Sequence, residues 1–145
     1  MVDVTAKDVT QRIAVAEGTV HTRVDVVEMI SANGLPKGDA LATARVAGIL
    51  AAKRTSELVP LCHPLAITGV DLGFTVGAAD DPGAIGITAT VRTTDRTGVE
   101  MEALTAVSVA ALTIYDMIKA VDRAARIDDI RVVRKEGGKT GTWAR

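Results

Sequence analysis

The sequence predicts an α+β fold of the ferredoxin-like βαββαβ type, in which two helices cover one face of an antiparallel sheet. The first observation is the order of its patterns, which read strand, helix, strand, strand, helix, strand. The second is a strong turn signal, Asp-Asp-Pro-Gly at 80–83, between two alternating stretches. The third is the length of 145 residues, which suits one domain with a sizeable core.

The first half of the chain is predicted to hold one strand and one long helix. Residues 1–17 are polar and irregular in pattern, whereas 20–30 is rich in Val and is expected to be a strand. A loop with Asn-Gly, Pro and Gly covers 31–39. Asp39 at its end can cap a helix over 40–58, and two prolines then end that helix and stiffen the connection.

The second half is predicted to hold a hairpin, a helix and a last strand. Residues 67–78 and 85–93 alternate between apolar and polar side chains on the two sides of the turn, as antiparallel strands do. A stretch without Gly or Pro predicts a helix over roughly 100–123. Residues 127–134 are expected to form the last strand, and a Gly-rich tail follows it.

No internal repeat or linker is visible, so we expect a single catalytic domain over 1–145 with flexible ends at 1–17 and 136–145. The net charge of -1 gives no overall field for nucleic acid or an anionic membrane. One cysteine excludes an intrachain disulfide, and two histidines show no zinc-ligand spacing, so we expect no resident metal or cofactor.

The start of the chain has no apolar stretch behind a basic residue, as a signal peptide would have. The longest charge-free apolar segment, Ala103–Tyr115, is shorter than the roughly 20 residues that span a bilayer. We therefore expect a soluble cytoplasmic protein. Because the second helix is apolar over nearly its whole circumference, and one sheet face lacks cover, we also expect a homo-oligomer.

Asp116 and Lys119 are the first candidates for chemistry, because they lie three residues apart on a nearly apolar helix. Charges in such a place are costly unless they are paired or used. They could form an acid/base couple whose pKa values are set by burial and by each other. A structural ion pair, within the helix or to another chain, is the other interpretation.

Leu61-Cys62-His63 forms a second candidate, in a connection stiffened by prolines. His63 can exchange protons near neutral pH, although a loop histidine bonded to a carbonyl is also common. Cys62 is expected to have a packing role rather than to act as a nucleophile, since no motif supports its activation. Glu100 and Glu102 at the start of the second helix either complement the helix dipole or bind the edge of a guanidine-like base.

Lys37, Arg12, Lys135 and Lys139 lie in polar or Gly-rich segments, where basic side chains hold phosphates or remain solvated. The Gly-rich stretch 137–141 lacks the spacing and setting of a P-loop, which excludes that type of nucleotide hydrolase.

Distance adds a constraint. Glu102 and Asp116 are fourteen residues apart, which is about 21 Å along one straight helix. If both line one site, two subunits must contribute to it.

Several blocks of sequence carry a resemblance when they are read together. They are Lys37-Gly-Asp, Ala42-Thr-Ala-Arg-Val-Ala-Gly-Ile, Ala52-Lys-Arg-Thr, Leu61-Cys-His-Pro-Leu, Thr97-Gly-Val-Glu-Met-Glu-Ala-Leu-Thr, Ala110-Ala-Leu-Thr-Ile-Tyr-Asp-Met and Gly137-Gly-Lys-Thr-Gly. The chain thereby closely resembles the family of molybdenum-cofactor biosynthesis protein C (MoaC), the cyclic pyranopterin monophosphate synthases. The similarity runs from about Met1 to Gly141.

The resemblance implies a ferredoxin-like subunit in a hexamer, built as a trimer of dimers with its active sites between subunits. The implied activity is that of a lyase in molybdenum cofactor biosynthesis. It converts 3',8-cyclo-7,8-dihydroguanosine 5'-triphosphate to the pterin derivative cyclic pyranopterin monophosphate and releases pyrophosphate. We expect neither a nucleic-acid nor a membrane partner. The sequence does not imply that Mg²⁺ accompanies the triphosphate.

The resemblance also implies residue roles. Asp116 and Lys119 correspond to the catalytic pair. The substrate-binding residues that it implies are Leu61, Cys62, His63, Glu100, Met101, Glu102, Lys37, Lys135 and Arg12. Lysines and the arginine would neutralise the triphosphate, and a glutamate would bind the guanine-derived edge. Two interpretations from other classes remain, a ligand-sensing module that binds without turnover and a purely structural oligomerisation protein.

Overall fold

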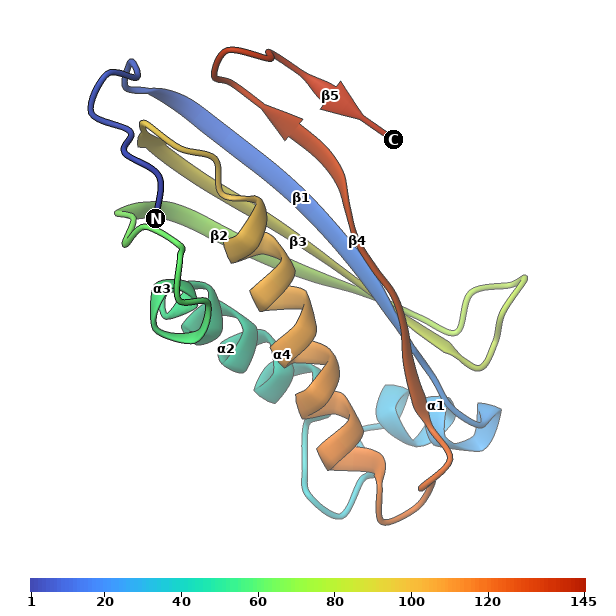
Figure 1. Cartoon of the computed structure of the whole chain (residues 1–145). Coiled ribbons are helices and arrows are strands. Elements are labelled where there is room, and N and C mark those ends of the chain that lie inside the picture. The colour runs from blue at the N-terminus through green and yellow to red at the C-terminus, as the bar shows by residue number, and fades with distance from the viewer.

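The computed structural model describes residues 1–145 and is built on one five-stranded antiparallel sheet (Figure 1). Its strands are β1 (Thr10–His21), β2 (Ile67–Val76), β3 (Ala84–Asp95), β4 (Arg126–Glu136) and β5 (Trp143–Ala144). The order across the sheet is β2-β3-β1-β4-β5. Each of the two long crossovers therefore skips one strand, as in a split βαβ unit. The predicted fold class is confirmed.

Four helices accompany the sheet, and the two longest form a layer on one of its faces (Figure 1). They are α1 (Val24–Ser31), α2 (Ala40–Ala52), α3 (Thr55–Leu58) and α4 (Glu100–Ile118). Asp39 caps α2 as expected, since its side chain accepts a hydrogen bond of 2.9 Å from the Ala42 N–H. The predicted helix over 40–58 is divided at Lys53 into α2 and the short α3.

The start of the chain differs from the prediction. Residues 10–17 belong to β1 rather than to an irregular segment, and 24–31 is a helix rather than a strand. The inward positions of β1 are small, such as Ala14 and Ala16, so its apolar alternation is weak in the sequence. In α1 the buried residues are Val26, Val27 and Ile30, which is helical spacing in a Val-rich segment.

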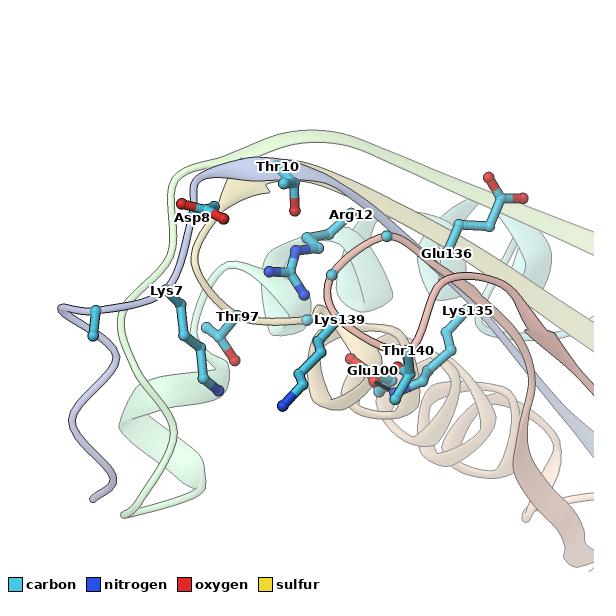
Figure 2. Close-up of a pocket in the computed structure, with 14 residues that line it drawn as sticks. Lys7, Asp8, Thr10, Arg12, Thr97, Glu100, Lys135, Glu136, Lys139 and Thr140 are labelled. Atoms are coloured by element: carbon cyan, nitrogen blue, oxygen red, sulfur yellow. Dashed lines mark hydrogen bonds and ion pairs between the residues drawn. The ribbon is translucent and has the colours of Figure 1, made fainter.

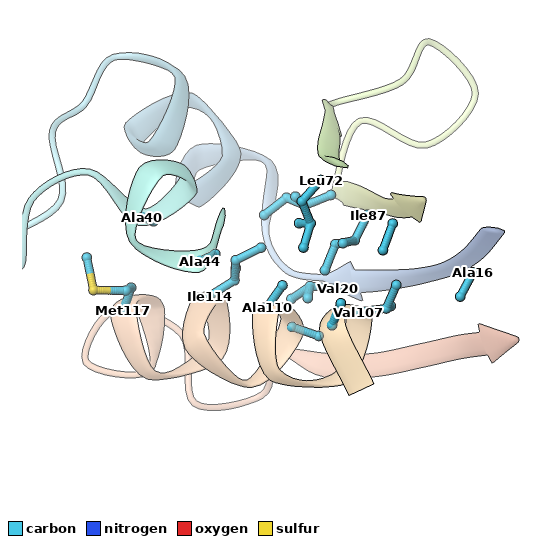
Figure 3. Close-up of a cluster of buried hydrophobic side chains, with 14 of the residues drawn as sticks. Ala16, Val20, Ala40, Ala44, Leu72, Ile87, Val107, Ala110, Ile114 and Met117 are labelled. Atoms are coloured by element: carbon cyan, nitrogen blue, oxygen red, sulfur yellow. The ribbon is translucent and has the colours of Figure 1, made fainter. Parts of the chain in front are cut away.

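Small residues allow α2, α4 and β1 to approach closely in the core (Figure 3). A Cβ atom on Gly48 of α2 would lie 2.8 Å from the Ala106 carbonyl oxygen of α4. A Cβ atom on Gly18 of β1 would lie 2.7 Å from Cγ1 of Val107. A larger residue at either position would force the layers apart. The core that results is one cluster of 24 buried apolar residues.

α4 is the central helix of this core. By length and composition alone it could cross a membrane, with a mean hydropathy of 1.4, but half of that window is buried inside the domain. The core helix of a folded domain has the same properties, and α4 rests on the sheet and on α2 (Figure 1). After β4 the chain turns back and adds the short strand β5 within the segment expected to be a flexible tail.

Candidate functional site

The candidate residues gather at the two ends of α4. The group at its C-terminal end consists of Lys37, Asp116 and Lys119. The group at its N-terminal end contains Glu100 and Glu102 on the helix itself, together with residues from β1, β4 and the loop after α3. Both groups belong to one chain, but the length of α4 separates them.

At the C-terminal end, two ammonium groups bind one carboxylate. Lys37 Nζ donates to Asp116 Oδ2 at 2.6 Å and to the main-chain oxygen of Asp116 at 2.9 Å. Lys119 Nζ lies 2.6 Å from the other carboxylate oxygen, Oδ1. The loop before α2 delivers Lys37, and the last turn of α4 delivers Asp116 and Lys119. The cluster carries a net charge of +1, at a helix end that favours cations.

The pKa of Asp116 is lowered from 3.8 to about 2, first by the hydrogen bond from Lys119 and then by that from Lys37. The pKa of Lys119 is raised, mainly by its hydrogen bond to Asp116. The side chains of Asp116 and Lys119 are about half exposed, at 53% and 52%. Of the two expected causes, mutual ion pairing sets these pKa values, whereas burial acts in the opposite direction on both groups.

At the N-terminal end of α4 lies a pocket of about 690 Å³ (Figure 2). It is largely polar, with a single hydrophobic residue among the 14 that line it. Four of the lining residues are cations, namely Lys7, Arg12, Lys135 and Lys139. Figure 2 shows the labelled side chains of Lys7, Arg12 and Lys139 around the same space. None of these three forms an ion pair within the chain.

Lys135 differs from the other three cations because it forms an ion pair with an acidic residue of the chain. Its Nζ lies 3.0 Å from Glu100 Oε1, which joins β4 to the first turn of α4. Two buried polar atoms at the pocket, Arg12 Nε and Thr10 Oγ1, have no hydrogen-bond partner. Unpaired cations, a free N–H donor and hydroxyl groups together suit a ligand with several negative oxygens.

The Gly-rich turn lies over Arg12, and its backbone requires glycine at two positions. Gly137 and Gly138 have φ values of +90° and +73°, which L-residues with a side chain rarely adopt. A Cβ atom on Gly138 would lie 2.0 Å from Arg12 Nη1, and one on Gly137 would lie 2.1 Å from the Gln11 carbonyl oxygen. The turn is therefore shaped by its closeness to β1, and it brings Lys139 to the pocket.

Glu102 and Cys62 also belong to the group at the N-terminal end of α4. Glu102 is only 4% exposed, and burial raises its pKa, with a smaller effect from the charge of Glu100. The pKa of the Cys62 thiol is also raised, mainly by burial and then by the charge of Glu102. Cys62 is thus no activated nucleophile. Next to it, Leu61 is 70% exposed and His63 is half-buried.

The structure brings Lys37 to Asp116 and Lys119, and it brings Lys135 to Glu100 in the pocket that Arg12 also lines. It does not join these two groups within one chain. Pocket residues that are absent from the predicted site include Lys7, Asp8, Thr10, Thr97 and Thr140. Thr97 and Thr140 lie in motif blocks that carry the family resemblance, which was a signal for both. Lys7 and Asp8 come from the segment read as irregular, and nothing in the sequence pattern marks them.

Fold and site together define a ferredoxin-like α+β domain with a cationic pocket that suits an anionic small molecule. At the other end of α4 it has a carboxylate bound by two lysines, which we call the lysine-clamped carboxylate. A family model described as the MoaC family matches residues 1–138. The chain belongs to the MoaC family. The predicted family is confirmed.

Three relatives are named cyclic pyranopterin monophosphate synthase, in one case with the suffix 2. That one, from Mycobacterium tuberculosis strain H37Rv, is 72% identical over 145 residues, which cover all of this chain and 84% of the relative. The protein of Streptomyces coelicolor is 65% identical over 145 residues, or 83% of its length. The protein of Roseiflexus castenholzii is 59% identical over 141 residues, which are 97% of this chain and 88% of the relative.

Proposed function

We propose that this chain is a lyase of molybdenum cofactor biosynthesis that forms cyclic pyranopterin monophosphate. Its substrate is 3',8-cyclo-7,8-dihydroguanosine 5'-triphosphate. In the reaction a new phosphoester bond forms at the α-phosphorus, pyrophosphate leaves from it, and the purine-derived rings rearrange to a pyranopterin. The single observation that carries the proposal is the family match over residues 1–138, together with relatives up to 72% identical that bear this name.

The cationic pocket supports the choice of a triphosphate. The departing pyrophosphate carries several negative charges, and Lys7, Arg12 and Lys139 are cations without an acidic partner in the chain. Fixed cations that face a developing phosphate charge lower the barrier to its departure. Lys135 would add a fourth cation if Glu100 released it and bound the guanine-derived edge of the substrate instead.

The lysine-clamped carboxylate supports proton transfer at the other end of the ligand. Ring opening and reclosure require protons to move at carbon, nitrogen and oxygen atoms. In the free chain Asp116 and Lys119 are both charged, because each stabilises the charged form of the other. A substrate oxygen that takes a hydrogen bond from Lys119 would release Asp116 from one of its two partners and raise its basicity. His63 is proposed as a further ligand or proton carrier.

The separation of the two groups supports a homo-oligomer with sites between subunits. One substrate can contact both groups only if a second copy supplies one of them. The exposed side of the helical layer offers apolar contacts for that copy, with Leu112 of α4 at 58% exposure and Val46 and Leu50 of α2 at 59% and 50%. We propose a hexamer arranged as a trimer of dimers.

The proposal includes no resident metal or cofactor, since phosphate charge is met by side chains. No group of three or more His, Cys, Asp or Glu residues could hold a metal ion. We also propose a cytoplasmic location, where a single free cysteine such as Cys62 stays reduced.

Incubation of the purified protein with the cyclised triphosphate, followed by measurement of released pyrophosphate and of the pterin product, tests the function. We expect stoichiometric formation of both. Asp116→Ala and Lys119→Ala are expected to abolish turnover while the oligomer persists in gel filtration. A matched control is Asp71→Ala, which removes an exposed carboxylate on β2, and it is expected to leave turnover unchanged. Substrate binding without any product from the wild-type protein would contradict the proposal.

A further inference from the structure

Arg96, in the turn between β3 and α4, connects three parts of the pocket. Its Nη1 atom donates to the carbonyl oxygen of Thr5 at 2.6 Å and also to that of Lys7. Its own carbonyl oxygen accepts a hydrogen bond of 3.3 Å from Arg12 Nη2. Arg96 thus ties the segment of residues 3–8, which we call the 3–8 segment, to Arg12 and to the start of α4.

The other hydrogen bonds of the 3–8 segment are local. The Lys7 N–H donates to the Val4 carbonyl oxygen at 3.0 Å, and the Thr5 N–H and hydroxyl donate to Asp3 Oδ1 at 2.8 and 2.6 Å. These bonds shape a turn but do not attach it to the domain. Both residues whose carbonyls Arg96 binds lie within this turn, and Lys7 and Asp8 line the pocket.

The same segment also lies near the loop after α3, which carries Cys62 and His63. The pKa of Asp3 is lowered mainly by the hydrogen bonds from Thr5, with a small coulombic contribution from His63. Figure 1 shows the N-terminal end of the chain beside the loop that follows α3, where His63 lies. The 3–8 segment therefore borders both the cationic pocket, which Lys7 and Asp8 line, and the loop after α3.

We propose that Arg96 is a positioning residue that holds the 3–8 segment against the pocket, so that Lys7 stands opposite Lys139 to bind the ligand's terminal phosphates. This inference rests on the proposed function for the identity of the ligand. Arg96 contacts no ligand itself and acts through Lys7. Its planar guanidinium suits the task, because one fork can donate to two carbonyl oxygens in a fixed geometry.

Pyrophosphate binding measured by calorimetry tests the proposal without turnover. We expect Arg96→Ala to weaken binding on the order of tenfold, which is the effect of losing about one charge-assisted hydrogen bond. In turnover assays the KM should rise by a similar factor while kcat stays within about twofold of wild type. The matched control is Arg92→Ala, which removes an equal charge from the outer side of β3, and it should bind as wild type does.

A double-mutant cycle separates positioning from a general loss of charge. If Arg96 acts through Lys7, Arg96→Ala combined with Lys7→Ala should bind pyrophosphate about as weakly as the weaker single variant. Additive losses would overturn the proposal, as would wild-type affinity in Arg96→Ala. Hydrogen exchange should also show faster exchange of the Lys7 amide in Arg96→Ala but not in Arg92→Ala, and equal rates in both would overturn the proposal.

The failure of the inference and that of the proposed function can be told apart. An inactive wild-type protein whose pyrophosphate affinity still depends on Arg96 through Lys7 would refute the function but keep the positioning role. An active wild-type protein whose KM and Lys7 exchange do not change in Arg96→Ala would refute the positioning role alone.

Discussion

Lys37 and Asp116 are 79 residues apart in the chain, yet the Lys37 ammonium donates at 2.6 Å to the Asp116 carboxylate. This contact ties the loop before α2 to the last turn of α4. Lys119 approaches the same carboxylate from within the helix, so both oxygens of Asp116 are bound by cations. A carboxylate in this setting remains ionised well below neutral pH, and it holds both lysine side chains in place.

The two lysines are expected to differ in their effect on the Asp116 pKa. The hydrogen bond from Lys119 is the largest cause of its decrease to about 2, and that from Lys37 is the second. Lys119→Ala should therefore raise the pKa of Asp116 further toward 3.8 than Lys37→Ala does. A carboxyl titration by NMR measures this directly, and the reverse order would contradict the assigned geometry.

The same pKa decrease predicts how acid affects the ion pair. A carboxylate whose pKa is lower in the folded than in the unfolded chain stabilises the fold above pH 3.8, and this contribution is lost as the pH falls toward about 2. The stability difference between wild type and Asp116→Asn should shrink over that window and be constant above it. Because the cluster is about half exposed, added salt should reduce the difference. Urea titrations at several pH values and salt concentrations measure both effects.

Gly138→Ala is expected to disrupt the cationic pocket. Its Cβ atom would lie 2.0 Å from Arg12 Nη1, so the guanidinium must move and its place beside the Gly-rich turn is lost. Pyrophosphate binding should weaken by roughly tenfold if one charge-assisted contact is lost. Gly141→Ala is the matched control, since Gly141 also has a positive φ but has open space around its Cβ position. Equal affinities of the two variants would show that backbone strain, not the approach to Arg12, decides the effect.

Asp122 is expected to stabilise the junction between α4 and β4. It is 6% exposed and accepts hydrogen bonds from the Thr22 hydroxyl at 2.7 Å and from the N–H groups of Arg23 and Ala124 at 3.3 and 2.9 Å. Asp122→Ala leaves these donors unsatisfied and should lower the free energy of unfolding by about 2–3 kcal/mol. Denaturant titration measures the loss, and Asp128→Ala, at an exposed position, should cost less than about 1 kcal/mol.

Most of the fold could be predicted because its helices and central hairpin have strong patterns. The alternation of β2 and β3 and the turn between them are visible in the sequence, and α4 is marked by a long stretch without Gly or Pro. The exceptions are β1, α1 and the short β5, which lies within the expected flexible tail. Close packing against α4 requires small inward residues in β1, and those weaken its alternation. Valines that favour strands lie in α1 because tertiary contacts bury them at helical spacing.

The site could be predicted only where motifs carry it. Asp116 and Lys119 share a helix turn, so their pairing follows from spacing, whereas the approach of Lys37 depends on a loop whose path no local pattern fixes. Lys7 enters the pocket through the hydrogen bonds of Arg96 to main-chain oxygens, and such bonds leave no mark in a single sequence. The chemistry of these side chains could be anticipated from the sequence, but the way in which the fold brings them together could not.

The central claim is that Glu102 of one subunit and Asp116 of another serve the same substrate. It is tested by mixing inactive Glu102→Gln and Asp116→Asn oligomers under conditions of proven subunit exchange and measuring pyrophosphate release. In a two-fold dimer, each mixed pair would contain one intact site out of two. Random exchange makes about half of the dimers mixed, so up to about a quarter of wild-type activity per protomer should return. No recovery of activity in verified mixed oligomers would contradict the shared site.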